Sequence, residues 1–202
     1  MKKLIAKKLL ELGCVKFSPD SPFVYASGLS GPIYCDNRMI LSHVSFRDIV
    51  IENFQKIIEK ENLTYDLLGG IATAGIPYAA IVADRLKKPM IYVRPKAKGH
   101  GKKNQVEGDF HHGQSVLLFE DLVNQGSSVL DAFNGLKEAG LNATVCLSIV
   151  DYQMQTAKRN LSEAQIQLFS LTDFSSLVET AFELELINLE NKNELYKWHQ
   201  GV

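Results

Sequence analysis

Two adjacent carboxylates, Glu120 and Asp121, directly follow the apolar run that begins at Val116. This pattern predicts a buried strand that delivers both acids to the edge of a sheet, where ligands of parallel α/β proteins bind. A short polar loop with one glycine, residues 124–128, then leads into a helix whose first N–H groups favour an anion such as phosphate. Carboxylates accept hydrogen bonds from sugar hydroxyls, so the stretch Val116 to Leu130 indicates a sugar phosphate site.

Two other segments that follow predicted strands carry residues suited to the same ligand. Residues 72–75 form a short loop before Pro77, which fits the first turn of a helix. Residues 94–114 are unusually long for a connection, and such loops are usually functional. Glycines at 99, 101 and 108 separate the cations of this segment, which are Arg94, Lys96, Lys98, His100, Lys102 and Lys103. Lysines on a closing loop would neutralise charge that develops on a departing pyrophosphate.

Each of these features also has a purely structural interpretation. A basic, glycine-rich loop is often only solvated, an acid pair often caps a helix, and Gly75-Ile76-Pro77 is often only a turn. His111 and His112 have no metal-ligand spacing, and we interpret them as solvated. The succession of three such loops after three strands favours a shared site.

The elements that position these loops alternate between strand and helix, which predicts a parallel sheet with right-handed crossovers. Glycine, proline and the apolar periodicity set the expected bounds. Strands are expected at 67–72, 90–93, 115–121, 143–150 and 165–169, and helices at 77–86, 127–139, 153–162, 172–183 and 190–199.

The residues before this alternation predict a small subdomain. Helical spacing of apolar residues predicts a helix over 2–12, and short strands are expected at 14–17, 23–26 and 32–36. A long helix is expected over 43–60, with Ser42 or Ser45 near its cap. The expected fold is α/β with a central, mainly parallel sheet in one domain over 1–202, of which about 1–40 form a hood and about 62–170 the core sheet.

Composition excludes some classes of partner. The 202 residues include 22 Lys+Arg and 23 Asp+Glu, so the net charge of −1 gives no pull toward nucleic acid or anionic membranes. Cysteines at 14, 35 and 146 are odd in number and lack metal spacing, which is typical of reduced thiols in a cytoplasmic protein. No apolar run approaches the length of a membrane span.

The acid pair, its loop and several longer segments of the chain resemble the motifs of a known family. The stretch Glu120 to Ser128 resembles the phosphoribosyl pyrophosphate signature of type I phosphoribosyltransferases. In the same order, the chain is similar to bacterial orotate phosphoribosyltransferases at Phe23-Val24-Tyr25-Ala26-Ser27-Gly28, Pro32-Ile33-Tyr34-Cys35-Asp36-Asn37-Arg38, Ala72-Thr73-Ala74-Gly75-Ile76-Pro77, Tyr92-Val93-Arg94, Lys98-Gly99-His100-Gly101, Asn104-Gln105-Val106-Glu107-Gly108 and Leu171-Thr172-Asp173-Phe174.

This resemblance implies a type I phosphoribosyltransferase fold and a reaction. Such enzymes transfer ribose 5-phosphate from phosphoribosyl pyrophosphate (PRPP) to orotate, giving orotidine 5′-monophosphate and pyrophosphate in pyrimidine (UMP) biosynthesis. The Mg²⁺ is carried mainly by PRPP rather than by protein ligands. The resemblance also implies a homodimer in which the 95–109 loop reaches the neighbouring site.

The resemblance also implies a role for each matching residue. Glu120 and Asp121 hold the ribose hydroxyls, and the loop that follows them holds the 5-phosphate. Thr73, Ala74 and Gly75 hold the pyrophosphate. Arg94 binds PRPP, Lys98 and His100 lie on the closing loop, and Ser27 and Arg38 belong to the hood over orotate. The phosphate loop consists of Leu122, Val123, Asn124, Gln125, Gly126, Ser127 and Ser128.

The chain departs from the family pattern inside this phosphate loop. Asn124 and Gln125 stand where the family usually has Ser or Thr and then Thr or Ala, and Ser127 stands where Gly is frequent. Main-chain N–H groups do most of the phosphate binding, but both replacements at 124 and 125 are bulkier. Three hypotheses therefore follow: an orotate phosphoribosyltransferase, a phosphoribosyltransferase of altered base preference or reduced activity, and a non-catalytic nucleotide-binding regulator.

Overall fold

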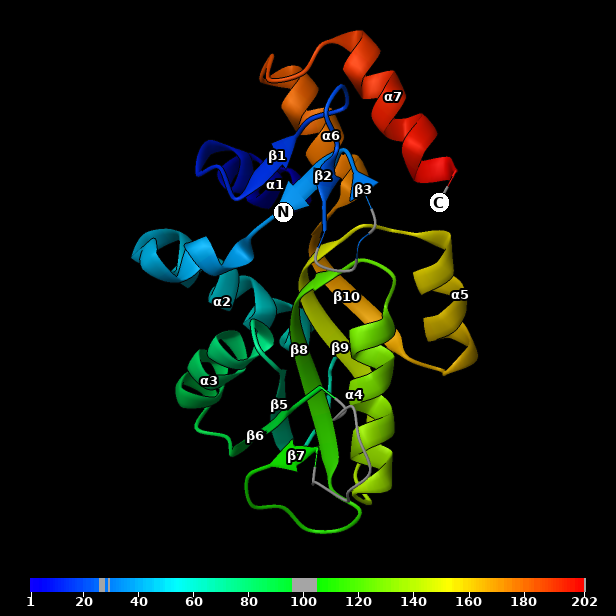
Figure 1. Cartoon of the computed structure of the whole chain (residues 1–202). Helices are drawn as coiled ribbons and strands as arrows, with labels where there is room; N and C mark the ends of the chain where they lie inside the picture. Colours follow the sequence, from blue (N-terminus) through cyan, green and yellow to red (C-terminus); the bar gives the residue numbers. More distant parts are fainter. Residues whose placement is uncertain (26–27, 29, 96–104, 202) are drawn as a thin grey trace.

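A six-stranded sheet forms the centre of the molecule, seen in a computed structural model that describes residues 1–25, 28, 30–95 and 105–201 (Figure 1). Every neighbouring pair of strands is parallel except β6 and β7, which are antiparallel. In spatial order the strands are β10 (Gln167–Asp173), β9 (Asn142–Asp151), β8 (Ser115–Val123), β5 (Leu67–Ile71), β6 (Met90–Val93) and β7 (Val106–Glu107).

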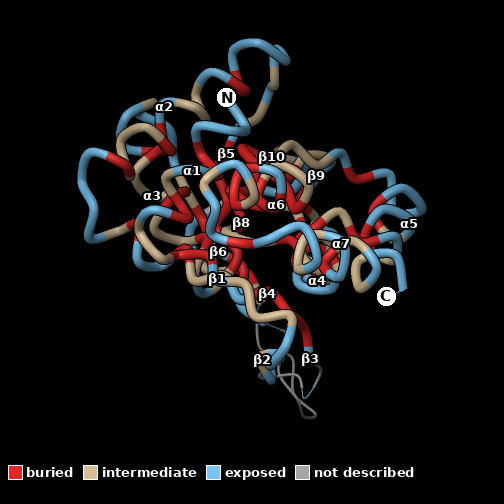
Figure 2. Tube along the Cα trace, turned by 90° about the horizontal axis from the view of Figure 1, so that it is seen from above, coloured by how far each residue is buried: buried red, intermediate tan, exposed pale blue. Residues whose placement is uncertain are grey.

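Helices cover both faces of this sheet, which is why the central strand β5 is buried along its whole length. Figure 1 shows α2 and α3 on one side and α4 and α5 on the other, and Figure 2 shows the buried strands between them. The helices are α1 (Lys2–Glu11), α2 (Val44–Lys60), α3 (Gly75–Leu86), α4 (Ser127–Glu138), α5 (Gln155–Glu163), α6 (Phe174–Glu183) and α7 (Leu189–Gln200). The predicted α/β class with a mainly parallel sheet is confirmed.

Short strands near the N-terminus form two small antiparallel sheets. One pairs β1 (Val15–Phe17) with β4 (Ile33–Cys35), and the other pairs β2 (Phe23–Val24) with β3 (Ser30–Gly31). A 3-10 helix, η1 (Asn37–Ser42), then leads toward α2. Figure 1 shows β1 to β3 above the end of the sheet at which β8 leads into α4.

Aromatic packing ties the helices to the central strand β8. Phe119 of β8 and Phe54 of α2 are both buried, and their rings meet edge to face with centroids 5.3 Å apart. All five residues of β5 are buried as well. Among the described residues the cysteines are free thiols, as predicted, and no helix has the length and apolar character needed to cross a bilayer.

The predicted starts of α3, α5 and α6 are each two residues from the observed ones. Helix α3 begins at Gly75 rather than Pro77, because the turn over 72–74 winds directly into it. Pro77 still lies in the first turn, where its missing N–H costs nothing. Helix α2 starts within one residue of its predicted start, and its N-cap is His43, directly after Ser42; His43 makes no side-chain cap bond.

The sequence-based bounds also miss strand residues at β3 (Ser30–Gly31), at β7 and at the end of β10. The polar segment after Arg94 contains β7, which pairs Val106 with Val93 and was expected to be loop. Strand β10 continues to Asp173, beyond the predicted end at residue 169, because its pairing with β9 extends as far as Asp151. Helix α6 therefore starts at Phe174 instead of residue 172.

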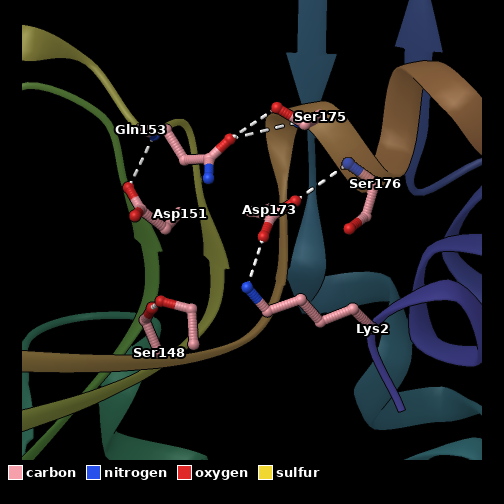
Figure 3. A network of polar contacts seen from close by, with 8 residues as sticks. Lys2, Ser148, Asp151, Gln153, Asp173, Ser175 and Ser176 are labelled. Carbon is pink, nitrogen blue, oxygen red and sulfur yellow. Dashed lines mark hydrogen bonds and ion pairs between the residues drawn. The ribbon is translucent and has the colours of Figure 1, made fainter.

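A polar network joins α1 to the ends of β9 and β10 (Figure 3). The Lys2 ammonium lies 2.6 Å from one carboxylate oxygen of Asp173, and the other oxygen accepts a hydrogen bond from the Ser176 main-chain N–H at 2.8 Å. Burial acts to raise the pKa of Asp173, but the bonds from Lys2 and Ser176 outweigh it and leave the pKa below its usual value.

We expect Lys2→Met to lower the free energy of unfolding at neutral pH by about 1 kcal/mol or less, because the ammonium is half exposed. A carboxyl with a lowered pKa stabilises the fold above its unfolded pKa, and that contribution disappears as pH falls through the folded pKa. The deficit of the variant should thus be constant above about pH 5 and shrink below about pH 3.9. Urea unfolding at a series of pH values measures it.

The matched control is Lys7→Met, which removes a surface pair with Glu11 whose charged atoms lie 3.8 Å apart. This change should have a smaller effect than Lys2→Met at neutral pH, because both partners are exposed. A deficit of Lys2→Met that stays the same down to the lowest pH would contradict the role assigned to the ion pair.

Candidate active site

The acid pair at the end of β8 lies at the carboxyl edge of the sheet, as predicted. Glu120 is only 6% exposed. One of its carboxylate oxygens accepts the Asp121 main-chain N–H at 2.9 Å, and the other accepts the Ser128 hydroxyl at 3.1 Å. Because Ser128 belongs to the first turn of α4, this bond closes the loop between strand and helix.

Burial strongly affects the protonation of the pair. Desolvation and then the neighbouring charge of Asp121 raise the pKa of Glu120 well above its usual value. Burial likewise raises the pKa of Asp121, against the opposing effect of hydrogen bonds with Glu120 and nearby main-chain groups. Two like charges in a poorly solvated place favour a ligand that brings hydroxyl donors or positive charge.

The loop after the acids opens onto the N-terminus of α4. Gly126, at φ +78°, is the N-cap residue and supplies no side-chain cap, and the first turn contains no acidic residue. The first helical hydrogen bond runs from Leu130 to the Gly126 carbonyl, so the N–H groups of residues 127–129 have no helical acceptor. Ser127 and Ser128 are exposed. These donors and the positive end of the helix form a phosphate-binding arrangement.

A second helix N-terminus lies against the same acids. The loop 72–74 contains a cis peptide bond between Ala72 and Thr73, and Ala74 precedes α3 without a side-chain cap. A Cβ atom on Gly75 would stand 2.2 Å from the Phe119 carbonyl oxygen and 3.3 Å from the Cα of Glu120. Thr73, Ala74 and Gly75 therefore lie beside the acid pair, as the predicted site requires.

The N-terminal segment reaches the acids through η1. The side-chain amide of Asn37 donates to the main-chain oxygen of Asp121 at 2.8 Å. The next residue, Arg38, makes two bonds to the Asp36 carboxylate, at 2.6 and 2.8 Å, and this pairing raises the pKa of the guanidinium. The structure therefore places Arg38 next to the acid pair, with Asp36 as its present partner.

Arg94 lies at the same edge of the sheet but is engaged elsewhere. It directly follows Val93, which pairs with Ile71 at the start of the 72–75 loop. Its guanidinium lies 2.7 Å from a carboxylate oxygen of Glu107, and both side chains remain partly exposed. A phosphate that reached Arg94 would have to compete with a surface ion pair, which is weak.

The remaining predicted residues divide into two groups. Val123 is buried, and its carbonyl accepts the Tyr152 N–H at 2.8 Å, whereas Leu122 is half-buried. Leu122 pairs with Val150 of β9, so both residues anchor the start of the loop that leads to α4. Ser27, Lys98 and His100 lie outside the described residues.

Asn37 and Tyr78 link the parts of the site, and the sequence assigned them no role. Asn37 is 0% exposed, and its main-chain oxygen accepts the Tyr78 hydroxyl at 2.7 Å. An asparagine between Asp36 and Arg38 has no periodic signal that predicts burial. Only the contact with β8 identifies it.

The described residues of the site do not provide a complete set of side-chain ligands for a metal ion. Among the described residues there is no cluster of three or more His, Cys, Asp and Glu side chains that could hold one. A divalent cation at this site would therefore need most of its oxygen ligands from a substrate, which is common for Mg²⁺.

Comparison with known proteins identifies the family. Residues 36–170 match the family described as "Phosphoribosyl transferase domain". The chain belongs to the phosphoribosyl transferase family. The matched range contains the acid pair, both helix N-termini, Arg38 and Arg94.

Full-length relatives belong to this family too. The chain is 45% identical over 196 residues to an orotate phosphoribosyltransferase of Coxiella burnetii, covering 97% of this chain and 94% of that protein. Its sequence is 30% identical to that of an orotate phosphoribosyltransferase from Aeropyrum pernix. The crystal structure of that protein superposes with a TM-score of 0.79, covering 91% of this chain and 99% of that one. A Leishmania donovani UMP synthase structure shares the fold, at 24% identity and a TM-score of 0.83. The match covers 100% of this chain and 42% of that longer one.

The loop residue Asn124 carries a buried side-chain oxygen without a hydrogen-bond partner. Such an oxygen destabilises the unliganded protein, so we expect Asn124→Leu to raise the free energy of unfolding by about 1 kcal/mol. The control is Asn142→Leu, which removes a 2.9 Å bond from an asparagine amide to the Gly113 carbonyl. That change should lower stability. Urea unfolding without ligand compares them, and equal destabilisation by both would contradict the unpaired state of Asn124.

Proposed function

We propose that the chain transfers the ribose 5-phosphate group of PRPP to orotate, forming orotidine 5′-monophosphate and pyrophosphate in pyrimidine (UMP) biosynthesis. The observation that carries this proposal is the acid pair, with Glu120 buried and Asp121 half-buried, between the uncapped N-termini of α3 and α4. That arrangement suits a ligand with hydroxyls between two phosphate groups. The name shared by the full-length relatives supports orotate as the acceptor.

The proposed contacts follow the order of groups along PRPP. The α4 end, residues 122–128, would hold the 5-phosphate with main-chain N–H groups. Glu120 and Asp121 would accept the ribose hydroxyls, and Thr73 to Gly75 would hold the pyrophosphate against the α3 N-terminus. Arg94 would exchange Glu107 for a phosphate oxygen, since a surface pair is easily broken. Arg38 and Ser27 would lie over the orotate.

In this reaction the bond from ribose C1 to the pyrophosphate oxygen breaks and a bond from C1 to N1 of orotate forms. Positive charge develops on the ribose ring, and negative charge grows on the leaving pyrophosphate. The carboxylate of Asp121 beside the ribose favours the first change, and the donors of the α3 N-terminus favour the second. Lys98 and His100 are proposed to act on the leaving group from the 95–109 loop.

We propose that Mg²⁺ enters the site bound to PRPP. The ion supplies charge neutralisation on the pyrophosphate, while this chain contributes the carboxylates of Glu120 and Asp121 next to the ribose. The ligand preference of Mg²⁺ for substrate and water oxygens suits a site built in this way.

We further propose that residues 1–202 act as one catalytic unit in a cytoplasmic homodimer. In this arrangement about 1–40 form the hood, about 62–170 form the core, and the 95–109 loop reaches the neighbouring site. Altered base preference and loss of turnover, the alternatives suggested by Asn124 and Gln125, are not favoured by the names of the relatives.

Purified protein with Mg²⁺ and PRPP should consume orotate and leave uracil and purine bases untouched. The physical reason is that an anionic acceptor suits the cations proposed around the base. Steady-state loss of orotate absorbance measures turnover, with each other base in a parallel reaction. Turnover of another base without turnover of orotate would overturn the proposal, and tight PRPP binding without turnover of any base would overturn it equally.

We expect Lys98→Ala to lower kcat by about tenfold or more while the dissociation constant of orotate changes by less than about threefold. The proposed contact strengthens only as pyrophosphate leaves, so its loss affects the transition state more than the bound substrate. Steady-state kinetics and calorimetry give the two quantities. Lys60→Ala, which removes a surface pair with Glu61, is the control and should change neither. Equal losses of kcat and orotate affinity in Lys98→Ala would contradict this role.

A further inference from the structure

Asn37 forms a buried junction between three parts of the molecule. It is 0% exposed and begins η1, next to the hood strand β4. Its side-chain N–H donates to the Asp121 main-chain oxygen, and its side-chain oxygen accepts the Cys35 thiol at 3.3 Å. Its main-chain oxygen accepts the Tyr78 hydroxyl of α3. Every polar group of its side chain is therefore used.

On the side that faces β5, strand β8 has no neighbouring strand where the acid pair stands, although β9 pairs with it on the other side, and Asn37 takes the open place. The pairing of β5 with β8 runs from Leu67 opposite Val116 to Gly70 opposite Phe119. Beyond Phe119, the turn over 72–74 carries the chain away from the sheet. The Asp121 carbonyl, two residues further along β8, bonds to the Asn37 amide. The Asn37 side chain thus continues the hydrogen bonding of the sheet at Asp121, the residue proposed to contact the ribose.

We infer that Asn37 is a positioning residue, which holds the Asp121 carboxylate and the hood in one geometry for the transfer of the ribose phosphate. This inference rests on the proposed function. Asn37 touches no substrate in the proposed arrangement; it acts through Asp121 on one side and through its chain neighbours Asp36 and Arg38 on the other. Misplacement of reacting groups by about 1 Å can cost about a hundredfold in rate.

The position of Asn37 explains how the hood residues Asp36 and Arg38 keep a fixed position relative to β8 and α3. Burial raises the pKa of Asp121, and the charge of Arg38, which is held by Asp36, acts against that rise. Asp36 and Arg38 are exposed or half-buried, so neither could anchor the hood by itself. The buried residue between them is bonded to β8 directly and to α3 through Tyr78, and those are the two elements that carry the proposed ribose and pyrophosphate contacts.

The first test removes the amide with Asn37→Ala. We expect kcat/KM for PRPP to fall by about tenfold or more, and the affinity for PRPP in calorimetry to fall with it. Asn142→Ala is the matched control, because it removes the same type of bond, from an asparagine amide to a main-chain oxygen, at 2.9 Å. Its kcat/KM should stay within about twofold of wild type. Asn37→Ser replaces the alanine variant if that protein does not fold.

The second test uses Asn37→Asp, which keeps the shape but exchanges the N–H donor for oxygen. When ionised, the introduced carboxyl repels the Asp121 carbonyl; when protonated, it donates the missing bond, and burial raises its pKa into the measured range. The activity of this variant relative to wild type should rise by about fivefold or more from about pH 8 to about pH 6. Glu120, Asp121 and Asp36 titrate in both proteins, beside the constant charge of Arg38, so the wild-type profile is the reference for the ratio. Cys35 and Tyr78, which contact residue 37, keep their protons over this pH range because burial raises both pKa values.

Each outcome decides the inference. Two results together support the inference. Asn37→Ala loses kcat/KM and PRPP affinity at temperatures where circular dichroism shows folded protein, and Asn37→Asp regains activity at low pH. Activity within about twofold of wild type in folded Asn37→Ala, or a pH-independent ratio for Asn37→Asp, overturns it. If wild-type protein binds PRPP but does not use orotate, the proposed acceptor fails, and the calorimetric comparison still decides the role of Asn37.

Discussion

The close approach of α3 to β8 is the constraint on which the site depends. A Cβ atom on Gly75 would stand 2.2 Å from the Phe119 carbonyl oxygen, and one on Gly70 would stand 2.6 Å from the Cα of Ile76. Real side chains do not tolerate such distances, so only glycine allows the helix to begin directly on the strand pair. This contact places the loop before α3 against the acids at the end of β8, and the rest of the site is arranged around that juxtaposition.

The electrostatics of the site follow from the same packing. A carboxyl as buried as Glu120 is costly to ionise, and its neighbour Asp121 adds like charge. The N-termini of α3 and α4 contribute partial positive charge from opposite sides, and neither brings an acidic residue in its first turn. The chain as a whole is nearly neutral, so an attraction of this site for anionic groups would come from this local field rather than from the net charge.

The parts of the fold that the sequence predicted are those in which one local pattern determines the structure. Apolar runs bounded by glycine or acids located β5 and β8, and helical periodicity located α1, α2 and α4 within a few residues. The same patterns put Glu120, Asp121 and the 72–75 loop at one edge of the sheet.

The parts that could not be predicted depend on partners distant in the sequence. Strand β7 consists of two residues, too few for a period, and exists because Val106 pairs with Val93. Strand β10 extends to Asp173 because β9 continues beside it, whereas the local sequence favours an earlier helix. Asn37 is buried because β8 offers an unpaired carbonyl 84 positions later, which no pattern near residue 37 reveals. The binding and catalytic roles assigned to the site residues stay predictions, those of Ser27, Lys98 and His100 included.

The departures from the family pattern at residues 124 and 125 are best understood from which atoms form the phosphate site. The donors at the α4 N-terminus are main-chain N–H groups, and Gly126 turns the chain so that they point outward at φ +78°. Side-chain replacement before that turn leaves these donors in place. What Asn124 changes is the polarity beside them, since its buried oxygen has no partner in the unliganded protein. A ligand group that donates a hydrogen bond there would satisfy this oxygen, whereas the main-chain donors of the helix do not depend on which side chain stands at position 124.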